Sequence, residues 1–329
     1  MDEGRGFDVV TLGESLAALV ATTPGPLEEA SLFERHVAGA EANVVVGLAR
    51  LGRSVAYIGR VGDDGFGTAI TRTLRGEGVD LAHLTVDREA RTGVMFRERR
   101  LLGAMDVVYH RAGSAGSRLT VEEVERAGAD GIFAGARWLH LTGITPALSP
   151  SARAACERAR ELASGSGATV SLDINLRRRL WSEDEAGPVL RALASKVDVV
   201  LGSVDELALI AGTDADGDPE GLVASVAERG PAIVVAKLGA GGAVGMEAGG
   251  RPVHAGAFEV PTVVDPVGAG DAFCAGFIAG RLDGADLASA LRMGNACGAL
   301  AVVASGDQAG LPTRAELDRF LAGGPDTLR

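Results

Sequence analysis

Short apolar runs that alternate with helical patterns along almost the whole chain restrict its fold more than any other feature. Most of the runs are apolar without a break, which is typical of parallel strands buried on both faces. We expect strands at Val9–Leu12, Val55–Ile58, Trp138–Leu141, Thr169–Leu172, Val197–Leu201 and Ile233–Ala236. We expect helices at Ala42–Leu51, Phe66–Glu77, Val121–Ala129, Ser151–Ser164, Asp205–Ala211 and Leu222–Glu228. This alternation predicts βαβ units around a central, mostly parallel sheet.

Two segments interrupt the alternation. Ala18–Val37 and Thr92–Arg111 contain short strand-like pieces but no long helix. We expect them to form a small β-element that projects from the main body, and an ordinary surface hairpin is the alternative. A chain of 329 residues with 47% hydrophobic residues can bury a large core. We therefore expect one α/β domain over residues 1–329.

Composition excludes several classes of protein. The formal net charge of −12 argues against a nucleic-acid or anionic-membrane binder. Cys156, Cys274 and Cys297 have no paired spacing, so neither a disulfide framework nor a zinc site is indicated. No apolar run is long enough to span a membrane, and the N-terminus lacks a signal-peptide pattern. We expect a soluble cytoplasmic protein.

The stretch Asp265-Pro266-Val267-Gly268-Ala269-Gly270-Asp271 precedes small and apolar residues that predict a buried helix. N–H groups at the start of a helix have no intrahelical acceptor, and Gly268 and Gly270 let the backbone turn so that these groups converge. Together with the helix dipole, they predict an anion site.

A carboxylate at Asp271 would repel a bound phosphate unless it has a task of its own. One such task is to accept a proton from an attacking hydroxyl group while the neighbouring amides stabilise a phosphoryl group. We expect the helix dipole to keep Asp271 ionised. The alternative is that Asp271 is only the N-cap of the helix. An N-cap tolerates replacement of Asp by Asn, whereas a general base does not.

Residues Asp265 to Ile278 resemble the second signature of the ribokinase-like carbohydrate kinases, also called the PfkB family. The resemblance implies a three-layer α/β/α sandwich with a small β-sheet lid, and ATP and Mg²⁺ as cofactors. It also implies that Gly268, Ala269 and Gly270 form the anion hole and that Asp271 is the catalytic base. A second stretch, Ala38 to Val44, resembles the N-terminal signature of the family, in which residues matching Gly39 and Asn43 contact the substrate.

The family also has an Asn-x-x-Glu motif that organises Mg²⁺ and phosphate oxygens. Here Ser203 replaces the Asn, and Glu206 is kept as a candidate metal ligand. The alternative for this pair is a capping box at a helix start. The resemblance further implies nucleotide contacts for Asn175, Lys237, Gly239, Gly242 and Asn295. For the residues of the glycine loop and around Asn295, packing by small residues is the alternative.

Recognition of a carboxylate-bearing substrate needs arginines, and Arg111 and Arg177 are the candidates. The surrounding segments Gly113–Ser117, Asp173–Arg177 and Gly306–Thr313 resemble the kinases of this family that act on 2-keto-3-deoxygluconate. That resemblance covers about Val9 to Phe320 and implies that both arginines hold the substrate carboxylate and that Tyr109 contacts the sugar acid. Met95 stands where a tyrosine is expected. The expected reaction is ATP-dependent phosphorylation of 2-keto-3-deoxygluconate to its 6-phosphate.

Other functions fit the sequence less well. A P-loop kinase is excluded because no Gly-Lys-Ser/Thr occurs, and the glycine run after Lys237 lacks the third Gly of a dinucleotide-binding fingerprint. A non-catalytic sugar-acid sensor is possible, but Asp271 and its glycines are intact. A kinase for a neutral sugar, such as fructose or ribose, is the alternative enzyme, although it would not need Arg111 and Arg177 together. A homodimer is expected from the family resemblance only.

Overall fold

A nine-stranded sheet forms the centre of the computed structural model, which describes residues 6–99, 106–213 and 218–323. Its strands, in spatial order, are β13 (Val253–Ala255), β12 (Ala243–Glu247), β11 (Ile233–Lys237), β10 (Val199–Ser203), β9 (Thr169–Asp173), β8 (Trp138–Thr142), β1 (Val9–Gly13), β4 (Val55–Gly62) and β5 (Leu84–Asp87). All neighbours from β11 to β5 pair in parallel, and β12 and β13 add an antiparallel edge. The six strands expected from apolar runs are confirmed.

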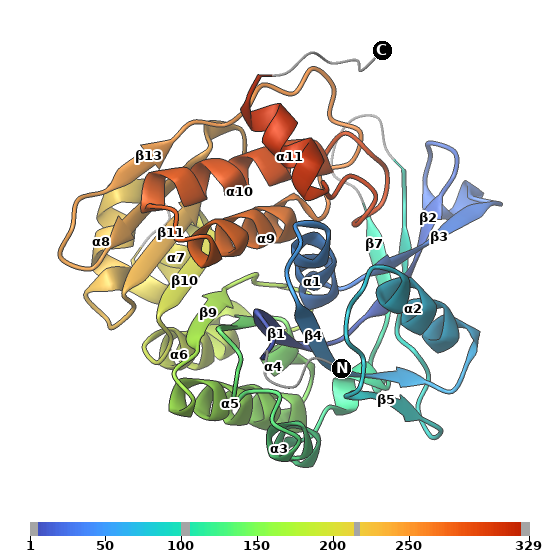
Figure 1. Cartoon of the computed structure of the whole chain (residues 1–329). Helices are drawn as coiled ribbons and strands as arrows, with labels where there is room; N and C mark the ends of the chain where they lie inside the picture. The colour runs from blue at the N-terminus through green and yellow to red at the C-terminus, as the bar shows by residue number, and fades with distance from the viewer. Residues whose placement is uncertain (1–5, 100–105, 214–217, 324–329) are drawn as a thin grey trace.

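Helices cover both faces of this sheet, so the three-layer α/β/α fold is confirmed (Figure 1). One face packs against α3 (Val121–Ala129), α5 (Pro150–Gly165), α6 (Glu183–Ala194), α7 (Val204–Ala211) and α8 (Pro219–Ala227). The other packs against α1 (Ala40–Arg50), α2 (Gly65–Gly76), α9 (Ala269–Leu282), α10 (Leu287–Ala301) and α11 (Arg314–Leu321). A short helix, α4 (Thr145–Leu148), follows β8.

The order of the strands reverses at β1. The chain first adds β4 and β5 on one side of β1, and then returns to add β8, β9, β10 and β11 on the other side. In open α/β sheets, ligands bind beyond the carboxyl ends of the strands at such a reversal. The topology therefore places the expected site near the ends of β1, β8 and β9.

The two interrupting segments form a second, four-stranded sheet. It consists of β3 (Phe33–Ala38), β2 (Leu16–Ala21), β6 (Val94–Arg97) and β7 (Val107–His110) in that order. The β2–β3 and β6–β7 pairs are antiparallel, and β2 joins β6 in parallel. The alternative of an ordinary surface hairpin is wrong, because the two segments pair with each other and the small sheet lies beside the main body (Figure 1).

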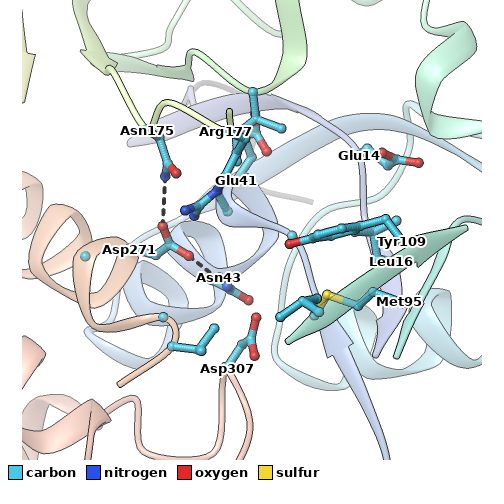
Figure 2. A pocket seen from close by; sticks show the side chains of 18 of the residues that line it. Glu14, Leu16, Glu41, Asn43, Met95, Tyr109, Asn175, Arg177, Asp271 and Asp307 are labelled. Atoms are coloured by element: carbon cyan, nitrogen blue, oxygen red, sulfur yellow. Dashed lines mark hydrogen bonds between the residues drawn. The ribbon is translucent and has the colours of Figure 1, made fainter. Parts of the chain in front are cut away.

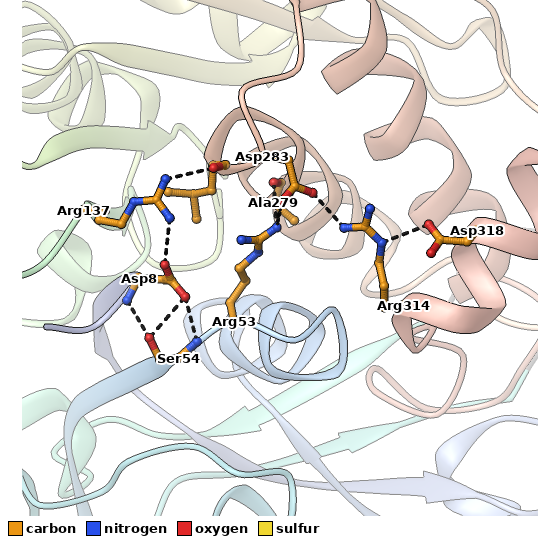
Figure 3. Close-up of polar contacts among 9 residues, drawn as sticks. Asp8, Arg53, Ser54, Arg137, Ala279, Asp283, Arg314 and Asp318 are labelled. Carbon is orange, nitrogen blue, oxygen red and sulfur yellow. Dashed lines mark hydrogen bonds and ion pairs between the residues drawn. The ribbon is translucent and has the colours of Figure 1, made fainter. Parts of the chain in front are cut away.

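Arginines hold the C-terminal end of α9, as Figure 3 shows. Arg137 donates to the carbonyl oxygen of Leu282 over 2.8 Å, and Arg53 forms an ion pair with Asp283. Arg314 binds the other oxygen of Asp283 at 2.7 Å. Cations at this end satisfy helix carbonyls and complement the dipole. Because the opposite end of α9 carries the expected anion site, these contacts help to fix the position of that site.

Removing two of these arginines is expected to lower stability. The double variant Arg53→Met/Arg137→Met should lose about 1–3 kcal/mol of unfolding free energy, because helix carbonyls and Asp283 lose charged donors. Urea unfolding measures the loss. Arg88→Met is the control, since its ion pair with Asp63 is solvent-exposed and should contribute less than about 0.5 kcal/mol. Equal urea midpoints for the double variant and for Arg88→Met would contradict a stabilising role of Arg53 and Arg137.

Candidate active site

A cavity of about 460 Å³ lies where the carboxyl ends of the central strands meet the small sheet. It brings together eleven of the residues predicted from the sequence: Gly39, Asn43, Tyr109, Arg111, Asn175, Arg177, Glu206, Lys237, Gly268, Gly270 and Asp271. Figure 2 shows Asp271, Asn43 and Asn175 on one side and Tyr109, Met95 and Leu16 on the other. Polar residues of α1, α9 and the loop after β9 therefore face a more apolar wall supplied by the small sheet.

The start of α9 has the geometry of an anion site. Gly268 is the N-cap, with φ 83° and ψ −9°, and Ala269, Gly270 and Asp271 form the first helical residues. Within the described part of the chain, the N–H groups of Gly270 and Asp271 have no protein acceptor, and the first intrahelical donor is Ala272. The alternative that Asp271 is the N-cap is wrong. Ala269 itself does not line the cavity.

Gly268 is a position where a side chain would do measurable damage. An alanine Cβ would stand 2.7 Å from the carbonyl oxygen of Asp307, in a backbone conformation that L-residues avoid. Gly268→Ala is expected to lower kcat by about tenfold or more, since it displaces the N–H groups that the sequence predicts to stabilise a phosphoryl group. Gly284→Ala is the matched control, because Gly284 has φ 79° but open space around it. The control should lose stability only; a kinetic defect as large as that of Gly268→Ala would refute this expectation.

Asp271 is buried and is held by two side-chain amides. Asn43 Nδ2 donates to its Oδ2 over 2.8 Å, and Asn175 Nδ2 donates to its Oδ1 over 3.3 Å. Burial raises the pKa of Asp271 to about 7, and the charge of Asp173 acts in the same direction, against the Asn43 hydrogen bond and the charge of Arg177. The expectation that the helix dipole keeps Asp271 fully ionised is corrected by this burial. A carboxyl group with this pKa can accept and return a proton near neutral pH.

Lys237 lies beside the start of α9. A Cβ added at Gly270 would be 3.5 Å from its Nζ atom. Burial alone would lower the pKa of Lys237, but the carboxylate of Asp173, 2.6 Å away, raises it above the ordinary value. The ammonium group therefore stays charged. A fixed cation next to free helix-start N–H groups suits a phosphate group.

Ser203 and Glu206 form the capping box that was the alternative to a metal site. The Ser203 N–H donates to Glu206 Oε2 over 2.8 Å, and the Leu176 N–H donates to Oε1 over 2.7 Å. Nowhere in residues 6–99, 106–213 and 218–323 do three His, Cys, Asp or Glu side chains gather around one point. Mg²⁺ usually keeps several waters and is held by one or two carboxylates together with substrate phosphates. Glu206 still lines the cavity, so these residues fit an ion that arrives with a nucleotide.

Arg111 has a partner that the sequence analysis missed. Its Nε donates to Glu14 Oε2 over 2.8 Å, its Nη2 contacts the same oxygen, and the Ser114 hydroxyl donates to the other oxygen. The guanidinium also lies 5.5 Å from the centre of the Tyr109 ring. Glu14 directly follows β1, and residues at the carboxyl ends of parallel strands are candidates for a site. The position of Glu14 directly after an expected strand could therefore have identified it from the sequence.

Arg97, on β6, links the small sheet to the loop before α9. Its side chain is 1% exposed and binds Asp265 at 2.6 Å and Asp307 at 3.0 Å. Asp265 in turn accepts a hydrogen bond from the Val267 N–H over 3.1 Å. Burial raises the pKa of Asp307 despite the charge of Arg97. Arg99 and Arg100 follow Arg97 closely in the sequence, so no sequence pattern singled it out.

Arg177 differs from the other cations of the cavity wall. The charges of Arg97, Arg111 and Lys237 are each balanced by at least one carboxylate within 3.0 Å. Arg177 has no such partner among the residues that the structure describes, although it lines the cavity and its charge acts on Asp271. It is therefore a cation that a bound anion can neutralise.

Three residues predicted to contact the nucleotide lie outside this cavity. A side chain at Gly242 would clash with the carbonyl oxygen of Ala255, at 2.1 Å. The amide of Asn295 donates to the carbonyl oxygens of Ala255 and Gly256 over 2.9 and 3.1 Å. Packing of the loop accounts for both residues. Gly239, with φ 56°, has open space around it, and the nucleotide contacts of all three stay predictions.

Comparisons with known proteins show which family the chain resembles. The model of the pfkB family carbohydrate kinases matches residues 7–314. The 2-dehydro-3-deoxygluconokinase of Bacillus subtilis (strain 168) is 39% identical over 319 residues, which cover 96% of each chain. The structure of the 2-dehydro-3-deoxygluconokinase of Thermotoga maritima has a TM-score of 0.86 at 30% identity, covering 96% of this chain and 99% of that one.

A similar structure also carries the expected cofactors. An E. coli protein assigned as a ribokinase II, solved in complex with ATP and Mg²⁺, has a TM-score of 0.87 at 28% identity and covers 96% of this chain and 99% of that one. The chain belongs to the pfkB family of carbohydrate kinases, whose cofactors are ATP and Mg²⁺. Among the helices that the structure describes, none has the length and apolarity needed to cross a membrane.

Proposed function

We propose that this enzyme transfers the γ-phosphoryl group of ATP to the terminal hydroxyl group of 2-keto-3-deoxygluconate and forms the 6-phosphate. The observation that carries the proposal is Arg177, an exposed cation in the same cavity as Asp271 that forms no ion pair with a carboxylate of the described residues. A sugar acid supplies a carboxylate that an arginine can bind through two hydrogen bonds, whereas a neutral sugar does not. The names of the similar enzymes from B. subtilis and T. maritima support the same substrate.

The sugar acid would lie between the apolar wall and the polar wall of the cavity. We assign its carboxylate to Arg177, with Arg111 beside it. Because Arg111 already binds Glu14, it orients the ligand more than it neutralises it. Tyr109 and Gly39 line the same cavity as these arginines and Asp271, and Gly39 leaves room for close approach of a hydroxylated carbon chain.

Asp271 would accept the proton of the attacking hydroxyl group, with Asn43 and Asn175 holding its two oxygens. The N–H groups at the start of α9 and the Lys237 ammonium would stabilise the negative charge of the transferring group. When bound, ATP supplies the phosphoryl group and Mg²⁺ neutralises phosphate charge. Glu206 is the proposed protein ligand of the ion, and Asn175, Gly239, Gly242 and Asn295 are proposed on the nucleotide side.

The test is a substrate panel with coupled detection of ADP. It contains 2-keto-3-deoxygluconate, 2-keto-3-deoxygalactonate, gluconate, fructose and ribose. We expect kcat/KM to be highest for a keto-deoxy sugar acid. Equal or better turnover of fructose or ribose would overturn the sugar-acid substrate and favour the neutral-sugar kinase. Binding of the sugar acid without any ADP formation would favour a sensor.

The family resemblance also leads us to propose a cytoplasmic homodimer built from one domain per chain. Light scattering of the purified protein tests the dimer, and a monomer at micromolar concentration would contradict it.

A further inference from the structure

Asp173, the last residue of β9, stands between the two halves of the site. Its side chain is 1% exposed. One oxygen accepts a hydrogen bond from Lys237 Nζ over 2.6 Å, and the other accepts one from Asn175 Nδ2 over 3.1 Å. Lys237 belongs to the phosphate side of the cavity, and Asn175 belongs to the side of the base. One buried carboxylate therefore contacts both.

The backbone at Asn175 needs such support. Asn175 has φ 41°, and it is the sole non-glycine residue with positive φ in the described part of the chain. Strain of this kind persists only where the surrounding contacts hold the backbone in place. The Asn175 amide is shared between Asp173 Oδ2 and Asp271 Oδ1. A shift of Asp173 would therefore change how Asn175 meets the base.

We propose that Asp173 is a positioning residue for phosphoryl transfer, which fixes Lys237 beside the start of α9 and directs Asn175 toward Asp271. The inference rests on the proposed kinase function. Asp173 itself needs no contact with either substrate. Its two hydrogen bonds couple the cation of the anion site to the geometry of the base, so that both are placed by one side chain.

Charges around Asp173 give this role a distinctive readout. Asp271 faces Asp173, Arg177 and Lys237, and Asp173 is the one of the three that raises its pKa. Asp173 also faces the Cys274 thiol on α9 and the buried His140 on β8. Loss of the Asp173 charge should lower the pKa of Asp271. A purely structural residue would change activity without moving the pH profile.

The kinetic test is Asp173→Asn. We expect kcat to fall by about tenfold or more, with the KM of the sugar acid changed less than about threefold, because a transition-state interaction is lost while substrate binding is kept. The acid limb of the kcat/KM profile should move to lower pH. If the limb stays at the wild-type pH, the proposal is overturned.

Asp173→Asn leaves a buried ammonium without its carboxylate, which can be strongly destabilising. A comparison of two further variants keeps the proposal testable. They are Lys237→Met and the double variant Asp173→Asn/Lys237→Met, which removes both charges. The acid limb of the double variant should lie at lower pH than that of Lys237→Met. Coincident limbs would overturn the proposal.

A second measurement needs no turnover. The chain has two lysines, Lys196 and Lys237, so reductive ¹³C-methylation gives two resolvable lysine signals in NMR, which Lys196→Arg assigns. Asp173→Asn should lower the pKa of Lys237 so that its signal titrates within the pH range in which the protein is folded, whereas the wild-type signal should not, since an ion-pair partner is lost. Glu157→Gln, which removes the exposed partner of Lys196, is the control and should leave Lys237 unchanged.

The two measurements separate the inference from the proposed function. An unchanged Lys237 pKa in Asp173→Asn would overturn the positioning role even in an active kinase. Failure of every substrate in the panel would overturn the proposed function, while a lowered Lys237 pKa would still support the contact on which the inference depends.

Discussion

Asp271→Asn is expected to lower kcat by about 10²–10⁴-fold, the usual contribution of a general base. The variant keeps the shape of the side chain, so Asn43 and Asn175 can still pack against it, but it cannot accept the proton of the attacking hydroxyl group. Steady-state kinetics with coupled ADP detection measure the loss. The KM values should change little, because the lost interaction belongs to the transition state.

Stability distinguishes this result from misfolding. Burial disfavours the charged form of Asp271, so above its folded-state pKa of about 7 the ionised carboxylate costs stability that Asn does not. Asp271→Asn should therefore be at least as stable as the wild type at pH 8. Asp286→Asn is the matched control, because Asp286 is the N-cap of α10 and Asn caps equally well. Near-wild-type kcat in Asp271→Asn would refute the role of the base.

The pH profile gives an independent check on Asp271. Its pKa is raised above the ordinary value of a carboxyl group, so the protonated form dominates below about pH 7 and cannot act as a base. The wild-type kcat/KM should fall about tenfold per pH unit below that point. The residual activity of Asp271→Asn should lack this acid limb. A wild-type limb near pH 4 would show that Asp271 is ionised as an ordinary surface carboxylate is.

The main sheet and the anion site could be predicted from the sequence because both depend on local patterns. Unbroken apolar runs mark β8 to β11, and glycines before a run of small residues mark the start of α9. β12 was missed because Gly245 interrupts its apolar run, and β13 was missed because it has only three residues. α6 was missed because Pro188 lies inside it.

The ion pairs of the site could not be predicted from the sequence. Arg97 meets Asp265 and Asp307 across 168 and 210 residues of sequence, and Arg111 meets Glu14 across 97. Partners this far apart are joined only by the fold. The sequence therefore identified Arg111 and Arg177 as equal candidates, and the structure distinguishes them through Glu14. The same limit applies to the pKa of Asp271, which depends on burial.

Arg177→Met is the second variant with a large expected effect. A charge-assisted hydrogen bond contributes about 1.5–3 kcal/mol, so loss of this cation should lower kcat/KM for the sugar acid by about 10–100-fold. Most of the change should appear as a higher KM, because the carboxylate is bound equally in the ground state and the transition state. For a neutral ketose, the variant and the wild type should have similar KM values.

The adjacent arginine provides the control for Arg177. Arg178 is also exposed, but it pairs with Glu183 at 2.7 Å, so Arg178→Met should leave the KM of the sugar acid within about twofold. Arg177 also lowers the pKa of Asp271, so the acid limb of Arg177→Met should move to higher pH, whereas that of Arg178→Met should not. A neutral ketose has no carboxylate, so losing a residue that binds the carboxylate should not weaken its binding. If Arg177→Met raised the KM of the neutral ketose as much as that of the acid, Arg177 would not be the residue that binds the carboxylate.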